Sequence, residues 1–135
     1  GIQDQVRLLG HVDQADLPAL YQGAAIFLYP TLYEGFGLPV VEAMASGTAV
    51  ITSQTSALRE IAEGAALLVD PLDVEAMAHA ITNLWSDPTL RIRYSELGRK
   101  RAARFRWIDA ARRTLAIYRA VIEGDGGGEP AGGAT

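Results

Sequence analysis

The chain of 135 residues contains no cysteine. This absence excludes disulfide bonds, thiolate metal sites, iron–sulfur clusters and a cysteine nucleophile, and it fits a reducing cytoplasm, where we expect the protein to be located. The sequence also lacks any apolar run near the roughly 20 residues that a membrane-spanning helix requires. Its first residues show no secretory signal pattern. These absences leave a globular domain with an apolar core as the most economical interpretation.

The composition supports one compact domain. Apolar residues make up 49% of the chain and charged residues 21%, which is typical of a folded protein of this length. We predict a domain over residues 1–123. Residues 124–135 are half glycine and have no large apolar side chain, so we predict a disordered tail there.

Charge is distributed unevenly along the chain. Residues 1–90 have a net charge of −9, with only Arg7 and Arg59 basic, whereas residues 91–119 have a net charge of +8. Such a basic segment suits nucleic acid, an anionic membrane face or the solvated sides of arginine-rich helices. No aromatic-interleaved binding motif accompanies these charges, so we favour solvated helices and predict no nucleic-acid partner. Peripheral contact of a longer protein with the cytoplasmic face of a membrane stays an alternative.

Short apolar segments alternate with helical patterns in the first half of the chain. This alternation predicts an α/β fold with a partial Rossmann-like open parallel sheet of about four strands, flanked by helices on both faces. We expect Ala25–Tyr29 to be buried on both faces because it is continuously apolar. The expected strands are Val6–Leu9, Ala25–Tyr29, Ala49–Thr52 and Ala66–Val69.

Helix boundaries are marked by capping residues, prolines and glycines. A run of three helices is expected to end the domain, with Trp85, Trp107 and Tyr118 as packing residues. The apolar face of the first of the three should contain Val74, Met77, Ala78, Ile81 and Leu84. The helices are expected from Asp16 to Gly23, from Pro39 to Gly47, over Ser56–Ala62 with Ser56 as the cap, after the cap Asp73, after Pro88, and over Ile108–Val121.

The loop between Tyr29 and the helix that starts at Pro39 has the features of a ligand site. Ligands of open parallel sheets bind beyond the carboxyl ends of strands, where helices begin. The unpaired N–H groups and the dipole of a helix start attract phosphate, and Gly35 and Gly37 let a ligand approach the backbone. Glu34 lies in the loop and Glu42 about one turn into the helix. Carboxylates accept hydrogen bonds from the vicinal hydroxyls of ribose or a sugar ring.

These residues together match a known signature. The chain contains Glu34-Gly35-Phe36-Gly37-Leu38-Pro39 and Glu42-Ala43-Met44-Ala45, with seven residues between the two glutamates. It thereby resembles the retaining glycosyltransferases of the glycosyltransferase group 1 family, over roughly residues 6–121. The resemblance implies the C-terminal half of a GT-B fold. It also implies transfer of a hexosyl unit from a nucleoside diphosphate sugar to an acceptor hydroxyl, with retained anomeric configuration.

The resemblance also implies roles for individual residues. Glu34 takes the catalytic position and contacts hydroxyls of the donor sugar, while Glu42 binds the ribose hydroxyls. Backbone N–H groups after Gly35 hold the diphosphate, and the backbone around His11 and Val12 faces the base. The donor-binding residues implied are Glu34, Gly35, Phe36, Gly37, Leu38, Glu42, Val12 and His11.

The resemblance implies no cofactor and no metal, since helix dipole and basic residues replace a cation. His11 and His79 are far apart in sequence and have no acidic cluster of ligand spacing, and we expect His79 to lie on a helix face. The basic pair that neutralises the donor diphosphate in the family has no counterpart here, nor does the N-terminal acceptor-binding domain. We therefore expect the chain alone to be inactive and to bind nucleotide weakly.

Other functions on this architecture stay open. One is a non-catalytic module that binds a nucleotide sugar, which need not keep both glutamates. Another is a different GT-B enzyme, such as a phosphorylase or a sugar-nucleotide epimerase. A dinucleotide-binding oxidoreductase is disfavoured, because Val40 stands where a third glycine would follow Gly35 and Gly37.

Overall fold

The computed structural model describes residues 1–124. It divides the chain into two compact units, the first covering Gly1–Arg104 and the second beginning at Phe105. The predicted glycine-rich tail lies outside the described residues, apart from Gly124. The domain boundary at residue 123 stays a prediction.

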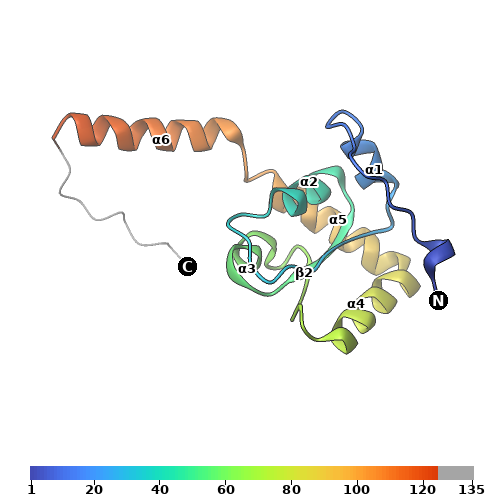
Figure 1. The fold of residues 1–135 in the computed structure, drawn as a ribbon. Helices are drawn as coiled ribbons and strands as arrows, with labels where there is room; N and C mark the ends of the chain where they lie inside the picture. The colour runs from blue at the N-terminus through green and yellow to red at the C-terminus, as the bar shows by residue number, and fades with distance from the viewer. Residues whose placement is uncertain (125–135) are drawn as a thin grey trace. The chain divides into compact units, whose positions relative to one another are not determined.

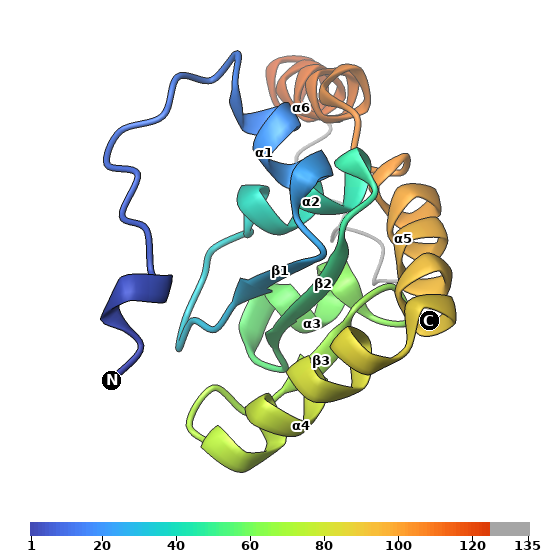
Figure 2. The same cartoon turned by 90° about the vertical axis from the view of Figure 1, so that its right-hand side faces the viewer.

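A parallel sheet forms the centre of the first unit (Figures 1 and 2). Among the described residues it contains β1 (Ile26–Tyr29), β2 (Ala49–Ser53) and β3 (Leu67–Val69), in the order β1-β2-β3. All five residues of the middle strand β2 are buried. The predicted α/β class with an open parallel sheet is confirmed.

The predicted strand at Val6–Leu9 is wrong. These residues adopt no regular secondary structure, and Leu8 is 92% exposed. A strand needs a neighbour that pairs its backbone groups and a surface that buries its side chains, and this segment has neither. Apolar β-type residues therefore did not suffice to make a fourth strand.

The burial expected for the strand at Ala25–Tyr29 is also wrong. The strand forms as β1, but it lies at one edge of the described sheet, and Leu28 is 38% exposed. Phe27 and Tyr29 share one face of β1, since side chains alternate along a strand, and Ile26 and Leu28 share the other.

Five helices follow the predicted order in the first unit. Local signals set their ends: Asp73 Oδ1 accepts a hydrogen bond of 2.9 Å from the N–H of Ala76 at the start of α4. The N-cap of α3 is Thr55, not the predicted Ser56. The helices are α1 (Leu17–Gly23), α2 (Leu38–Ser46), α3 (Ser56–Ala62), α4 (Val74–Ser86) and α5 (Pro88–Ala102), after a short 3-10 helix, η1 (Gln3–Gln5).

An apolar core joins the sheet to α4 and α5. Partly buried Ile26, Met77 and Tyr94 pack against it. Its buried residues are Ala49, Ile51, Val69, Ala80 and Leu84.

Part of the face predicted for α4 is wrong. Val74 is 79% exposed and Ala78 is exposed, while Ala80 is buried. Trp85 is also exposed instead of packed. His79 lies on the exposed side of α4.

The second unit contains α6 (Trp107–Ile122), which confirms the predicted helix at Ile108–Val121. Arg106 pairs with Asp109 through two hydrogen bonds of 2.7 and 3.1 Å at its start. Trp107 and Tyr118 are exposed on this helix, so they do not form a core within this unit. Of the helices in the described part of the chain, none combines the length and apolarity needed to cross a bilayer.

Candidate donor site

The candidate site lies where the chain leaves β1 and enters α2. Gly37 is the N-cap of α2, and its carbonyl accepts the N–H of Val40 at 3.0 Å. The N–H of Leu38 is in the first turn and has no partner within the helix, and Pro39 has no N–H. The positive end of the α2 dipole therefore faces the loop that holds Glu34.

Gly37 and Gly35 differ in what the fold requires of them. Gly37 has a φ of +94°, and a Cβ added there would overlap Cδ2 of Leu58. Gly35 has no positive φ, and a Cβ at that position would meet nothing within 4 Å. The fold itself thus requires glycine at residue 37, whereas Gly35 faces open space that a ligand can occupy.

Tyr29 orients the carboxylate of Glu34. The Tyr29 hydroxyl donates a hydrogen bond of 2.7 Å to Glu34 Oε1, and both residues are half-buried. A neutral donor on a carboxylate makes a short, charge-assisted bond. Glu34 is therefore held at the carboxyl end of β1, beside the start of α2.

Tyr21 contacts the second glutamate in the same way. Its hydroxyl, on α1, donates a hydrogen bond of 3.2 Å to Oε2 of Glu42 on α2. Glu42 is exposed while Tyr21 is half-buried. The predicted position of Glu42 on the first turns of α2 is therefore found, with an acceptor group open to solvent.

The two tyrosines are joined through Phe27. The rings of Tyr21 and Phe27 meet edge to face, with centroids 5.2 Å apart and an interplanar angle of 89°. Phe27 and Tyr29 are stacked, with centroids 5.9 Å apart and an angle of 16°. We call Tyr21, Phe27 and Tyr29 the aromatic row. Its two tyrosine hydroxyls bind Glu34 and Glu42, so both glutamates belong to one connected set of side chains.

Buried polar residues around β2 hold the backbone under the aromatic row. Thr52 Oγ1 donates to the carbonyl of Tyr29 at 3.0 Å, and Thr48 Oγ1 donates to the carbonyl of Tyr21. The N–H of Thr31, just after β1, donates to Ser53 Oγ at 2.9 Å. Thr48 is 3% exposed, and Thr52 and Ser53 are fully buried. These buried hydroxyls thus have hydrogen-bond partners of their own, in the carbonyls of β1 and α1 and in the N–H that follows β1.

These contacts raise the pKa of both tyrosines above the ordinary value of 10.0. For Tyr29 the main cause is the hydrogen bond to Glu34, followed by burial and the carboxylate charge. For Tyr21 the main cause is burial, followed by the charge of Glu42 and the hydrogen bond to it. The bonded neutral tyrosine contributes stability that is present below pH 10 and lost as the pH rises through the folded-state pKa.

The Glu34→Gln variant is expected to lower the pKa of Tyr29 towards 10.0, because it removes the carboxylate that favours the protonated hydroxyl. The measurement is an alkaline NMR titration of ring-labelled tyrosines. Glu75→Gln, an exposed change on α4, serves as the control and should leave the Tyr29 titration unchanged. An unaltered Tyr29 titration in Glu34→Gln would contradict the hydrogen bond.

The remaining predicted site residues lie in the loop that leads into α2 and in the segment that precedes α1. Phe36 and Leu38 flank Gly37 and are 43% and 45% exposed, so this part of the loop presents an open surface. His11 and Val12 lie in the segment before α1, where His11 Nε2 is 3.7 Å from Asp13 Oδ1 on the surface. Their role at the base stays a prediction.

The sequence analysis missed the aromatic row as part of the site. Phe27 and Tyr29 stand two residues apart in an apolar strand, and this spacing alone places two rings on one face. The sequence therefore contained enough information to predict that these two rings lie side by side. The partner Tyr21 depends on how α1 packs, which no local pattern gives.

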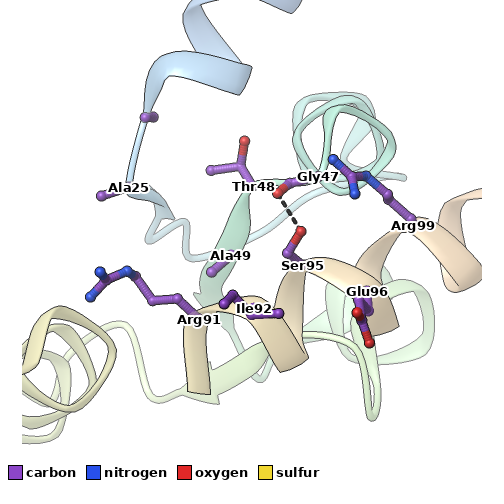
Figure 3. A pocket seen from close by; sticks show the side chains of 10 residues that line it. Ala25, Gly47, Thr48, Ala49, Arg91, Ile92, Ser95, Glu96 and Arg99 are labelled. Carbon is purple, nitrogen blue, oxygen red and sulfur yellow. Dashed lines mark hydrogen bonds between the residues drawn. The ribbon is translucent and has the colours of Figure 1, made fainter. Parts of the chain in front are cut away.

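A pocket whose lining includes neither Glu34 nor Glu42 lies in the same unit. It has a volume of about 360 Å³ and is lined by residues before β1, at the start of β2 and along α5 (Figure 3). Ser95 donates a hydrogen bond of 2.6 Å to the carbonyl of Gly47, and the Arg99 guanidinium lies against the same glycine at the end of α2. Arg91 donates to the carbonyls of Leu84 and Trp85 at the end of α4. These side chains contact the carbonyl ends of α2 and α4. Their positions are therefore explained by capping of the helix C-termini and do not indicate a bound ligand.

Within residues 1–124, no group of three or more His, Asp and Glu side chains could hold a metal ion. Metal-independent chemistry stays a prediction.

The chain is similar in sequence to known glycosyltransferases. A family model described as glycosyl transferases group 1 matches residues 1–101. O-antigen chain mannosyltransferase B of Escherichia coli is 39% identical over 114 residues, which cover 84% of this chain and 30% of that protein. The MMP alpha-(1->4)-mannosyltransferase of Mycolicibacterium hassiacum is 39% identical over 126 residues, covering 90% and 31%. The chain thus spans about a third or less of these curated relatives.

Solved structures give the same result. Sucrose-phosphate synthase from Thermosynechococcus elongatus superimposes with a TM-score of 0.83 and 35% identity, over 90% of this chain and 31% of that one. The C-terminal domain of a glycosyl transferase group 1 family protein from Francisella tularensis has a TM-score of 0.63 and 33% identity, over 70% and 50%. The fold is therefore that of the C-terminal domain in such proteins.

Proposed function

The chain belongs to the family of glycosyl transferases group 1, and from this premise we propose that it binds the nucleoside diphosphate sugar donor of a retaining hexosyltransferase. The observation that carries this proposal is the pair of carboxylates, Glu34 and Glu42, on either side of the α2 start. Each accepts a hydrogen bond from a tyrosine. Two acceptor groups around one anion-binding helix start suit a ligand with hydroxyls at both ends and phosphate between them.

Each part of the donor has a matching group in this arrangement. Glu42, exposed on α2, accepts hydrogen bonds from the ribose hydroxyls. Glu34, in the catalytic position, accepts hydrogen bonds from hydroxyls of the sugar and orients its anomeric carbon. The backbone N–H groups of Phe36, Gly37 and Leu38 are directed at the diphosphate, where negative charge grows as the sugar leaves.

The whole protein would transfer the hexosyl unit to an acceptor hydroxyl. This chain covers about 30% of its curated relatives, so the acceptor site and the basic residues that neutralise the diphosphate would lie in another part of such a protein. We propose that the chain alone is inactive and that it binds nucleotide weakly, because residues 1–90 contain just two basic residues, Arg7 and Arg59, to help the helix N–H groups oppose the diphosphate charge. We also propose that the reaction needs no metal or cofactor, and that it takes place in the cytoplasm.

An NMR titration of the chain tests the proposal. Amide shifts are recorded with UDP, GDP and ADP, and then with their mannose and glucose conjugates, because several relatives are named mannosyltransferases. We expect shifts to cluster at residues 35–42, with one base preferred and a dissociation constant near millimolar. Inorganic pyrophosphate is the control for binding through phosphate alone.

Absence of shifts at residues 35–42 with every nucleotide at millimolar concentration would contradict binding by this chain. Equal shifts with pyrophosphate and nucleotides would instead favour a phosphate site without a role for Glu42. That result would support the phosphorylase alternative.

A further inference from the structure

We infer that Tyr21 and Tyr29 are positioning residues for the two carboxylates, each fixing the glutamate that receives one part of the donor. The inference rests on the proposed function. Neither tyrosine needs to touch the donor in this role. Each acts through the carboxylate that accepts its hydroxyl, so Tyr29 serves the sugar end and Tyr21 the ribose end.

Several contacts hold Tyr29 in one position, so that its hydroxyl is a fixed hydrogen-bond donor. Its ring stacks on Phe27, its carbonyl accepts from Thr52, and the chain just after it is tied to Ser53. With backbone and ring both held, the hydroxyl reaches Glu34 Oε1 at 2.7 Å. Restricting the rotamers of a loop glutamate before the ligand arrives reduces the entropy that binding has to remove, and this hydrogen bond contributes to that restriction.

Tyr21 has the same construction on a different element. Thr48 holds its carbonyl, Phe27 contacts its ring edge to face, and its hydroxyl is 3.2 Å from Glu42 Oε2. The bond joins α1 to α2, two helices that are in contact. It selects one orientation of a side chain that is otherwise exposed.

Phe27 couples the position of Tyr21 to that of Tyr29. It is the ring that both tyrosines contact, so a change in its position alters both hydroxyls together. The alternative is that the three rings only fill space under α1. A packing role alone requires neither hydroxyl, and this difference makes the two interpretations separable.

The test compares Tyr21→Phe and Tyr29→Phe, which keep the rings and remove only the hydroxyls. Dissociation constants of the preferred nucleoside diphosphate, its 2′,3′-dideoxy analogue and its sugar conjugate are measured for the full chain. Tyr33→Phe is the matched control, since Tyr33 lies in the loop that holds Glu34 and is 77% exposed. A second readout needs no ligand: the Cδ chemical shifts of Glu34 and Glu42 at pH 7, from labelled protein.

We expect Tyr21→Phe to weaken binding of the nucleoside diphosphate about three- to tenfold, and to have no effect on the dideoxy analogue or in the Glu42→Gln background. Tyr29→Phe should weaken only the sugar conjugate, by a similar factor. Each variant should shift the Cδ signal of its own glutamate.

Unchanged affinities in both tyrosine variants, with the parent chain binding nucleotide, would overturn the positioning role while leaving the proposed function intact. So would equal losses for the dideoxy analogue, which would mark a general structural effect. If the parent binds no nucleotide, the proposed function falls and this role with it, and the Cδ shifts then report only a structural hydrogen bond.

Discussion

Gly37→Ala is expected to destabilise the chain by about 2–4 kcal/mol. Residue 37 has a φ of +94°, a conformation that costs free energy for any residue with a Cβ. The added methyl group would also overlap Cδ2 of Leu58, a side chain that is fully buried and cannot move aside without disturbing the core. Urea unfolding followed by circular dichroism measures the change in the free energy of unfolding.

Gly35→Ala is the matched control, two residues away in the same loop. Its Cβ would enter open space and its φ is not positive, so we expect the stability to change by less than about 0.5 kcal/mol. Adding Leu58→Val to Gly37→Ala should relieve part of the overlap, so that the two losses are less than additive. Equal effects of the two alanine substitutions would contradict the contact between the loop and α3.

Glu42→Gln is expected to weaken nucleoside diphosphate binding about ten- to hundredfold. The substitution keeps the shape of the side chain but replaces a charged acceptor of ribose hydroxyls with a neutral amide, and hydrogen bonds to charged groups are the stronger class. Calorimetric titration of the chain with the preferred nucleotide measures the loss. Because Glu42 is exposed, stability should change little.

Glu34→Gln is expected to distinguish binding of the sugar from binding of the nucleotide. This variant should bind the free nucleoside diphosphate as the parent does and lose affinity only for the sugar conjugate. Glu75→Gln, on α4 and exposed, controls for the loss of one negative charge. Equal losses in all three variants would show a general charge effect and would argue against a specific ribose contact at Glu42.

Local signals in the sequence predicted the elements that depend on local chemistry. Gly47 ends α2 as predicted, with a positive φ, Pro39 lies in the first turn of that helix, and Asp73 caps α4 through its side chain. Capping and turn chemistry involve residues within four positions of each other, so the sequence contains both partners.

Features that depend on distant partners were harder to predict. Val6–Leu9 has the composition of a strand, yet no pairing or burial accompanies it in the structure. Tyr21 lies 21 residues from Glu42, and their hydrogen bond depends on the packing of α1 against α2. The sequence thus predicted the carboxylates through their spacing, and it held a signal for the pair Phe27 and Tyr29, whereas the contact of Tyr21 with Glu42 became visible only in three dimensions.

The edge position of β1 has a consequence for handling the chain in solution. An edge strand presents unpaired N–H and C=O groups, a template on which an extended segment of another molecule can add and begin aggregation. β1 has only four residues, and Pro30, which has no N–H to donate, follows it directly. Because this edge is short and is followed by a proline, we expect it to limit growth of an intermolecular sheet at the concentrations that binding experiments require.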